Sequence, residues 1–275
     1  MTSPILLTGG TGTLGRLVVP RLLEAGHDVR VLSRGRHESG QGVEYATGDL
    51  ATGKGIDAAL NGVRTILHCA GSAKGDEVKA SNLVGAASRS GAQHLVFVSV
   101  VGADRVPVAS PVDRAMFGYF ASKRSAERIV ADSGLPWTTL RATPFHDLVL
   151  TTVQGMAKMP VIPVPSGFRF QPVDAAEVAT RLVELSAGPP AGLVPAMGGP
   201  RVYEMKELLR GYLRATGRHR LTVPARMPGK AARAFRAGAN LAPEQAIGRR
   251  TWEEFLTERL RRDRATTGPL APARP

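Results

Sequence analysis

The segment TGGTGTLG at residues 8–15 places glycines at positions 9, 12 and 15, in the spacing GxxGxxG. It lies between an apolar run at 4–8, which predicts a strand, and an amphipathic stretch at 14–25, which predicts a helix. In this context one glycine makes the tight turn, one lets backbone N–H groups approach a pyrophosphate, and one lets helix and strand pack closely. The alternative is a tight turn without a ligand. The expected cofactor-binding residues here are Thr8, Gly9, Gly10, Thr11, Gly12, Thr13, Leu14 and Gly15.

Strand-like and helix-like stretches alternate through the first two thirds of the chain. Runs rich in Val, Ile and Leu predict strands that are covered on both faces. Their alternation with helices predicts an α/β fold, a doubly wound parallel sheet of the Rossmann type. The expected strands after the first are 28–32, 43–46, 63–69, 94–99 and 137–140, and the expected helices are near 54–61, 76–90 and 114–133.

The pattern loosens after residue 150. We expect a dinucleotide-binding Rossmann domain at 1–150 and a smaller C-terminal substrate-binding part at 151–264, of which 170–185 rejoins the Rossmann core. Residues 161–170 are rich in proline and aromatic residues and predict a loop or lid, whereas 205–216 and 252–262 predict helices. The segment ATTGPLAPARP at 265–275 predicts a disordered tail.

Composition excludes several classes of protein. The 275 residues include a single cysteine, Cys69, so no intramolecular disulfide is possible, and no metal site is expected. No apolar run is long enough to cross a bilayer, and a strand and glycine loop stand where a signal peptide would lie. We therefore expect a cytoplasmic protein, a monomer or homodimer, with a small-molecule substrate and no membrane partner.

The net charge of +13 is unevenly distributed. Residues 200–275 hold 17 basic and 7 acidic residues, whereas residues 1–199 are nearly balanced. A basic chain suggests nucleic-acid binding. However, the sequence lacks a helix-turn-helix, finger or basic-zipper motif, so no nucleic-acid partner is expected. Charges of both signs alternate within 252–264, as on a solvated helix face.

The end of the second expected strand indicates which dinucleotide binds. An acidic residue there selects NAD, because it bonds the ribose 2′-hydroxyl, whereas an arginine accommodates the 2′-phosphate of NADP. This chain has Ser33 and Arg34 and no carboxylate at either position. Arg34 offers bidentate donors and Ser33 a hydroxyl. The expected cofactor is NADP(H); the alternative is a solvated loop arginine.

The segment YFASK at 119–123 has the form YxxxK. On a helix, residues four apart share a face, so the Tyr119 phenol and the Lys123 ammonium are neighbours. Hydride transfer to a carbonyl leaves an alkoxide that needs a proton, and a tyrosine whose pKa is lowered by a nearby lysine can supply it. The alternative is an ordinary helix pair.

These motifs, together with TGDL at 47–50, CAG at 69–71, FVSVVGADR at 97–105 and LPWTTLRATPF at 135–145, resemble the NmrA-like, atypical branch of the short-chain dehydrogenase/reductase superfamily. That branch contains NAD(P)H-binding reductases and non-catalytic redox sensors. The resemblance implies that Lys123 also bonds the nicotinamide ribose. It implies further cofactor contacts at Asp49, Leu50, Cys69, Ala70, Gly71, Thr143, Pro144 and Phe145.

The superfamily also places a Ser or Thr after the fifth strand to polarise the carbonyl. Ser99 is that residue in one alignment register; in the other the position falls on Val101, which cannot hydrogen-bond. For the substrate side we expect an apolar pocket that includes Phe117 and Met156, with His146 either lining it or serving as a polar loop residue. The expected function is an NADPH-dependent oxidoreductase acting on a small, largely apolar carbonyl or related acceptor. The alternative is a non-catalytic NADP(H)-binding redox sensor.

Overall fold

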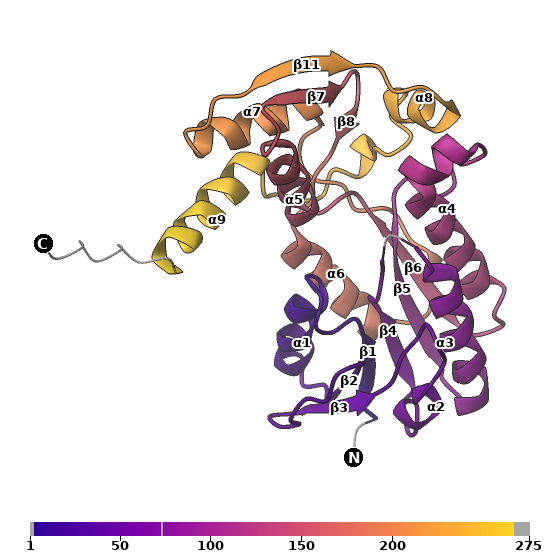
Figure 1. Cartoon of the computed structure of the whole chain (residues 1–275). Helices are drawn as coiled ribbons and strands as arrows, with labels where there is room; N and C mark the ends of the chain where they lie inside the picture. Colours follow the sequence, from indigo (N-terminus) through magenta and orange to yellow (C-terminus); the bar gives the residue numbers. More distant parts are fainter. Residues whose placement is uncertain (1–2, 73, 267–275) are drawn as a thin grey trace, which may run out of the picture.

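The computed structural model describes residues 3–72 and 74–266. Within them a parallel sheet has the strand order β3-β2-β1-β4-β5-β6-β9 (Figure 1). The order reverses direction between β1 and β4, which is the switch point where doubly wound folds bind dinucleotides. The predicted α/β Rossmann fold is confirmed. The strands are β1 (Ile5–Thr8), β2 (Val29–Ser33), β3 (Val43–Thr47), β4 (Thr65–His68), β5 (His94–Val100), β6 (Trp137–Ala142) and β9 (Gly192–Leu193).

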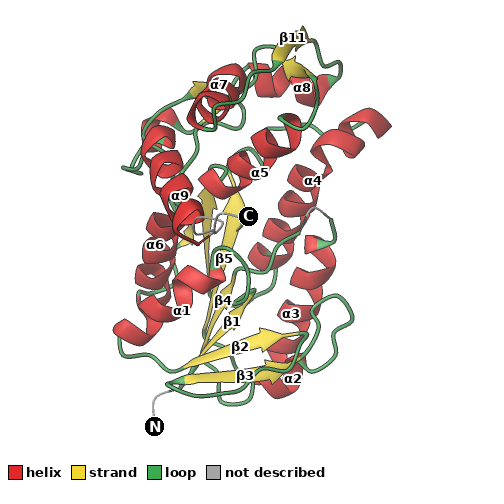
Figure 2. Cartoon of the chain, turned by 60° about the vertical axis from the view of Figure 1, so that its left-hand side comes forward, coloured by secondary structure: helices red, strands yellow, loops and turns green. Residues whose placement is uncertain are grey.

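Helices cover both faces of the sheet (Figure 2). Because side chains alternate along a strand, Leu7 of β1 packs toward one face and Leu6 toward the other. The first face is covered by α1 (Gly15–Glu24) and α6 (Ala175–Ala187), through Val18 and Leu182 among others. The second face is covered by α2 (Ile56–Ala59), α3 (Asp76–Ser90) and α4 (Pro111–Ala131).

The C-terminal part joins the sheet at the carboxyl end of β6. Two small sheets form there: β7 pairs in parallel with β11, and β8 pairs antiparallel with β10. Helices α5, α7 and α9 share one apolar core. The elements are α5 (His146–Met156), β7 (Val161–Pro165), β8 (Arg169–Phe170), β10 (Tyr203–Glu204), α7 (Met205–Ala215), β11 (Leu221–Ala225), α8 (Lys230–Arg236), the 3-10 turn η1 (Pro243–Gln245) and α9 (Trp252–Thr266).

The structure differs from the sequence expectation in this part. Residues 161–170 form β7 and β8 instead of a loop or lid, because Ile162 and Val164 are buried while β7 pairs with β11, which is distant in sequence. Helices α5 and α8 were not predicted. Helix α9 extends to Thr266, two residues into the predicted tail, and residues 267–275 lie outside the described part of the chain. Within the described ranges, every helix is too short or too polar to span a bilayer.

One carboxylate connects α4 to α8. Asp113, in the first turn of α4, forms a capping box with Ser110, which precedes the helix. Its Oδ1 atom also accepts a hydrogen bond of 3.2 Å from the backbone N–H of Ala231, in the first turn of α8. Hydrogen bonds, first of all from Ser110, hold the pKa of Asp113 below its ordinary value. The C-terminal part is thereby fixed to the helix that carries the YxxxK pair.

Candidate active site

The glycine loop connects β1 to α1 through close backbone contacts. A Cβ atom on Gly15 would lie 2.2 Å from the Gly9 carbonyl oxygen, and one on Gly9 would lie 2.7 Å from the backbone nitrogen of Ala70. Gly9 also has a φ of +73°, which a side chain disfavours. Gly10 faces Val31, where a Cβ would approach a methyl group to 2.7 Å. These three glycines are required for packing.

Gly12 is in a different situation. A Cβ atom there would meet only the Gly9 carbonyl oxygen, at 3.2 Å, and the residue is exposed together with Thr11 and Thr13. Leu14 occupies the N-cap position of α1, and no side chain caps this helix end. The N-terminus of a helix attracts anions because its first N–H groups lack partners and its dipole is positive there. The loop is therefore open on the side where a pyrophosphate would bind.

The end of β2 presents Arg34 to solvent. Within the described chain no hydrogen bond or ion pair engages its guanidinium, whereas Ser33 pairs with the His37 ring at 2.9 Å and accepts from the N–H of Gly35. This arrangement leaves Arg34 free to meet an anionic group.

The remaining predicted cofactor residues lie along the same edge of the sheet. Asp49 accepts a hydrogen bond from the N–H of Ala51 and so forms a turn after β3, while Leu50 is buried against the α2 and α3 face. Cys69 and Ala70 follow β4, and burial raises the pKa of the Cys69 thiol to about 12, so the thiol stays protonated. A Cβ on Gly71 would lie 3.3 Å from the ammonium of Lys123, so this turn passes directly beside the YxxxK pair.

The ammonium of Lys123 is buried in an ion pair. Its Nζ atom lies 3.0 Å from Oδ2 of Asp76, with the two side chains only 4% and 1% exposed. It also donates to the carbonyl of Val98 at 3.2 Å, and it lies 4.9 Å from the ring centre of Phe97 and 5.9 Å from that of Tyr119. The predicted Tyr119–Lys123 proximity is thus present, together with a carboxylate that neutralises the lysine.

Asp76 was not anticipated from the sequence. Although burial alone would raise its pKa, the charge of Lys123 and the hydrogen bonds from Lys123 and Ser72 hold that pKa below its ordinary value. Asp76 begins α3, and its backbone N–H donates to Ser122 of α4 at 3.0 Å. Helices that follow adjacent parallel strands begin at the same edge of a sheet, so a carboxylate soon after the fourth strand was the available signal.

The phenol of Tyr119 is protonated in this environment. Burial, and then the negative charge of Asp76, raise its pKa above the usual value. Lys123 alone would lower the pKa of Tyr119. That effect is absent, because Asp76 compensates the lysine charge. The ring of His68 is also uncharged. Burial, and to a smaller extent the charge of Lys123, lower its pKa to about 3.

Ser99 lies on the α4 side of β5. It shares the face of the strand with Phe97, and its hydroxyl is buried without a hydrogen-bond partner among the described residues. Val101 follows the strand, is buried, and donates its backbone N–H to the carbonyl of Ala142. Of the two register positions, only Ser99 therefore brings a hydroxyl to this side of the sheet.

The turn after β6 is fixed by backbone hydrogen bonds. The N–H of Thr143 donates to the carbonyl of Met197, and the carbonyl of Pro144 accepts from the N–H of Val173. Phe145 packs against the core on the α1 and α6 face. At two of the expected cofactor residues, Thr143 and Pro144, a backbone group is thus already paired within the chain.

His146 is fully buried and is not at an open site. Its Nε2 atom lies 3.0 Å from the carbonyl of Arg250, and its ring stacks on Phe255 at 5.0 Å. Burial lowers its pKa, so the neutral ring donates to that carbonyl. The expected substrate contact has no support in this placement, since the ring joins α5 to the start of α9.

The two apolar residues expected at the substrate lie in different clusters. Phe117 belongs to a cluster packed against Tyr119, whereas Met156 packs with α7 and α9. The centre of the Tyr119 cluster is Phe235 of α8, which sequence reasoning missed. The helical spacing of Ala231, Ala232 and Phe235 was the available signal. Phe235 has ring-centre distances of 5.2 Å to Phe117, 5.5 Å to Phe120, 5.1 Å to Phe168 and 5.8 Å to Phe170.

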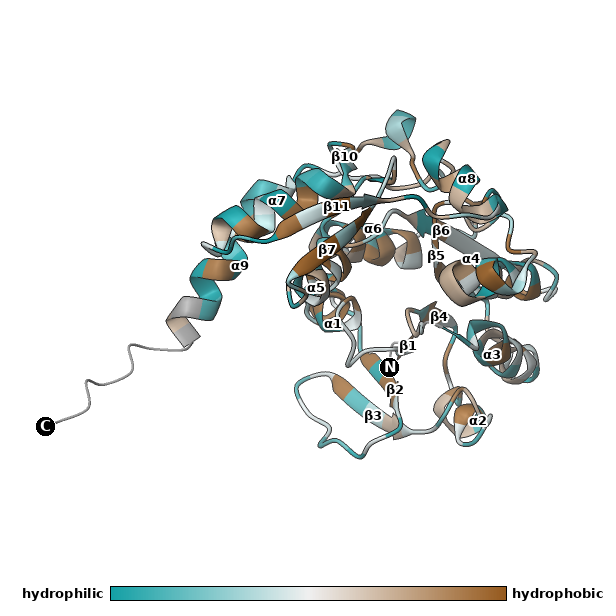
Figure 3. Cartoon of the chain, turned by 45° about the horizontal axis from the view of Figure 1, so that its top comes forward, coloured by the Kyte–Doolittle hydropathy of each residue, from teal (hydrophilic) through white to brown (hydrophobic). Residues whose placement is uncertain are grey.

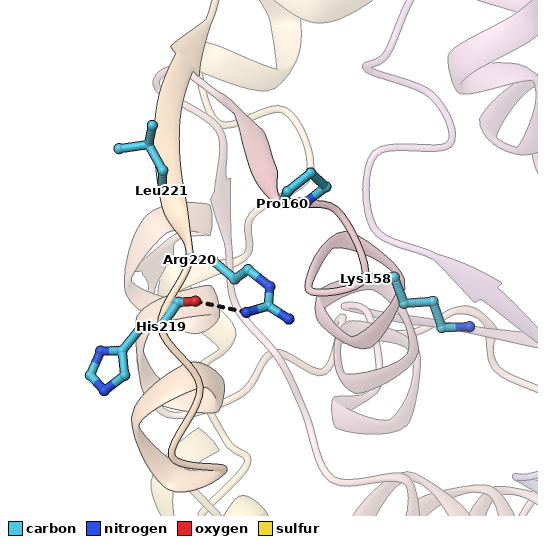
Figure 4. A pocket seen from close by; sticks show the side chains of 5 residues that line it. All are labelled: Lys158, Pro160, His219, Arg220 and Leu221. Atoms are coloured by element: carbon cyan, nitrogen blue, oxygen red, sulfur yellow. Dashed lines mark hydrogen bonds between the residues drawn. The ribbon is translucent and has the colours of Figure 1, made fainter.

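Among the described residues, a larger and a smaller cavity lie in the C-terminal part. The larger, of about 730 Å³, is lined by Lys158, Pro160, His219, Arg220 and Leu221 (Figure 4). The smaller, of about 220 Å³, lies between β7, β11 and the start of α7. Neither is lined by the glycine loop or by Tyr119.

The comparisons with known proteins agree with this geometry. A family model described as NAD(P)H-binding matches residues 9–185, from the glycine loop through most of α6. The (4-alkanoyl-5-oxo-2,5-dihydrofuran-3-yl)methyl phosphate reductase of Streptomyces griseus is 30% identical over 222 residues, covering 78% of this chain and 74% of that protein. Ceramide reductase of Caulobacter vibrioides is 30% identical over 226 residues, covering 78% and 70%.

A solved structure resembles nearly the whole chain. The NADPH-dependent quinone oxidoreductase of Escherichia coli, in complex with NADPH, has a TM-score of 0.77, covering 93% of this chain and 99% of its own, at 18% identity. At that identity the likeness concerns the fold. The matched family model and the two relatives support the resemblance first drawn from the motifs. The chain therefore belongs to the NAD(P)H-binding family of Rossmann proteins.

Proposed function

We propose that the protein is an NADPH-dependent reductase of a small, largely apolar carbonyl compound or a related acceptor. The observation that carries the proposal is the group formed by Tyr119, Lys123 and Asp76 at the edge of the sheet where the glycine loop lies. A protonated phenol beside a buried ammonium suits a proton donor for a developing alkoxide. Both relatives are named reductases, which supports the same class of reaction.

The residues of the loop and of the β2 end fit NADP(H). Gly12 leaves the loop open, α1 has an uncapped N-terminus for the pyrophosphate, and Arg34 is exposed for the 2′-phosphate. The bound cofactor supplies the hydride. In this proposal Tyr119 gives the proton and Lys123 holds the ribose, while Ser99 supports the oxyanion. The aromatic cluster around Phe235 bounds the acceptor on the C-terminal side.

The preference for NADPH is tested by Arg34→Ala. The wild type should bind NADPH more tightly than NADH, and the variant should lose that difference. Hydrogen bonds to a charged group contribute about 1.5–3 kcal/mol, so the expected loss of NADPH affinity is about tenfold to a hundredfold. Fluorescence titration of both cofactors measures it, with NADH affinity as the internal control. Equal affinities in the wild type would remove the role of Arg34.

The catalytic role is tested by Tyr119→Phe. Removing the phenol should lower kcat by about 10²–10⁴, because general acid catalysis is lost, while NADPH affinity stays nearly unchanged. Tyr212→Phe removes a hydroxyl from α7, away from this edge of the sheet, and is the matched control. A screen of carbonyl compounds followed by NADPH absorbance provides the substrate. Full turnover by Tyr119→Phe on that substrate would show that another group donates the proton.

One observation favours the alternative of an NADP(H)-binding redox sensor. The Ser99 hydroxyl is buried, and the other register position, Val101, has no hydroxyl. A sensor would bind NADPH with the preference described above but would reduce no compound in the screen. Reduction of any acceptor that depends on Tyr119 decides for the enzyme.

A further inference from the structure

A long basic stretch in the C-terminal part is not used by the proposed reaction. Between Glu207 and Glu244 the chain has no acidic residue and eight basic ones. This stretch forms most of α7 and all of β11 and α8. The exposed members are Arg210, Arg214, Arg218, Arg220, Arg226, Lys230 and Arg233.

Most of this charge is not neutralised locally. Within the described chain, the side chains of Arg218 and Arg226, on either side of β11, have no hydrogen-bond or ion-pair partner. Arg220 is bonded only to the carbonyls of Ala157 and His219, which leaves its charge uncompensated. On the N-terminal side of the stretch the nearest acidic residues, Glu204 and Glu207, form the capping box of α7, and Glu207 also pairs with Arg201.

An apolar surface lies within this basic region. On the outer side of the β7–β11 pair, Leu221 is 64% exposed, Val161 44% and Val223 39%. The strand register places Leu221 opposite Val161 and Val223 opposite the exposed Pro163. Ile162 and Val164 of β7 point inward and are buried. We call the group Val161, Pro163, Leu221 and Val223 the β7–β11 face.

The β7–β11 face is accessible at one end of the molecule. The two strands run along the top in Figure 1, with α7 on one side and α8 on the other, at the opposite end from β3 and α2. In Figure 3 β11 lies between β7, whose ribbon carries apolar residues, and α7, whose ribbon carries hydrophilic ones. In Figure 4 the side chains of His219 and Leu221 point outward, away from the helix that ends near Lys158.

We propose that the β7–β11 face and the basic residues around it bind the surface of an anionic lipid bilayer. Arginine and lysine are attracted to anionic headgroups, and exposed aliphatic side chains enter the acyl boundary. Nucleic acid fits less well: among the described residues none of the exposed large apolar side chains is aromatic, and single strands bind by stacking on aromatic rings. Duplex phosphates would leave the aliphatic face unused. This contact is peripheral, and it departs from the sequence expectation of no membrane partner.

Flotation of the full chain with two kinds of vesicle tests the proposal. The protein should float with phosphatidylcholine–phosphatidylglycerol vesicles at low salt, less at high salt, and not with phosphatidylcholine alone. Arg218→Gln combined with Arg226→Gln should weaken binding by at least about tenfold, since each basic residue near an anionic surface contributes about fivefold. Leu221→Ser combined with Val223→Ser should also weaken it, by removing the inserted side chains.

Two substitutions elsewhere are the matched controls. Leu193→Ser changes an apolar residue of β9 that is 52% exposed, and Arg128→Gln changes an exposed arginine of α4. Both should bind vesicles like the wild type, and all variants should keep NADPH affinity, which reports the fold. Absence of binding to anionic vesicles, or equal binding to both vesicles, would overturn the proposal. The proposal would also be overturned if the protein bound duplex DNA more tightly than vesicles and if the Leu221 and Val223 substitutions left vesicle binding unchanged.

Discussion

Burial and, after it, the charge of Asp76 in its buried pair with Lys123 keep the neighbouring Tyr119 protonated. An ammonium alone would favour the phenolate of Tyr119, but Asp76 lies 3.0 Å from the same ammonium and its charge acts in the opposite direction. Asp76 therefore adds to the effect of burial, and Tyr119 keeps its proton before a cofactor adds its own charge. Asp76 acts through Lys123 and Tyr119, so we regard it as a positioning residue.

Asp76→Asn should change both stability and the pH dependence of reduction. Removing one member of a buried ion pair costs about 3–5 kcal/mol, and urea unfolding measures this loss. Loss of the negative charge should lower the pKa of Tyr119, so the alkaline limb of the pH–rate profile should move to lower pH. Asp57→Asn, in an exposed pair with Arg89, should change neither property. An unmoved alkaline limb in Asp76→Asn would mean that Asp76 has only a structural role.

At the scale of single residues, local spacing could be read from the sequence and contacts between helices could not. The proximity of Tyr119 and Lys123 could be predicted, because residues four positions apart on a helix lie on the same face. The partner of Lys123 is on α3, and its distance depends on how two helices pack. His146 shows the reverse error: a polar residue after a strand suggested a site, but the packing of α9 buries it.

Within the glycine loop, the glycines should differ in their tolerance of a methyl group. Gly15→Ala places a Cβ 2.2 Å from a carbonyl oxygen of the loop, so we expect a loss of at least about 1–3 kcal/mol of stability. Gly12→Ala meets one atom at 3.2 Å and should keep the fold while losing NADPH affinity, because the methyl lies on the open side of the loop. Urea unfolding and NADPH titration separate the two effects. Normal NADPH affinity in Gly12→Ala would place the pyrophosphate elsewhere.

At the scale of elements, the central strands β1, β4 and β5 of the main sheet were predictable because they are buried, which requires continuous apolar runs. The β7–β11 pair was not, since β7 contains Pro163 and Pro165 and its partner lies far along the chain. The short helix α8 owes its place to the Asp113 carboxylate and to the aromatic cluster. Neither contact is visible in the local sequence.

For the whole molecule, acid should reduce stability through buried histidines. Burial lowers the pKa values of His68, His94 and His146, so each is neutral when folded. The unfolded chain binds a proton at His68 below its ordinary pKa of 6.5, whereas the folded protein does so only near 3. Between these values the unfolded state holds more protons, so the free energy of unfolding falls as pH falls.

Replacing His68 should weaken this dependence. One neutral buried histidine makes stability fall by about 1.4 kcal/mol for each pH unit below its unfolded pKa. His68→Phe should reduce the slope of the unfolding free energy against pH by about 1.4 kcal/mol per pH unit, the value for one proton. Urea unfolding at several pH values measures this slope. Phe97→Leu disturbs the same packing without a titrating group, and it should lower stability equally at every pH. An unchanged slope in His68→Phe would mean that the ring titrates normally in the folded state.

The path of the chain between the sheet and the C-terminal part restricts how such a protein can be rebuilt. After β6 the chain leaves to make α5, β7 and β8, returns as α6 and β9, and leaves again for β10. A fragment ending before α6 would expose Val18 and Leu22 of α1, which pack with Leu182. The C-terminal part therefore cannot be exchanged between relatives as a single contiguous cassette. A functional chimaera needs crossover points on both sides of α6 and β9, with that returning segment kept alongside its own α1.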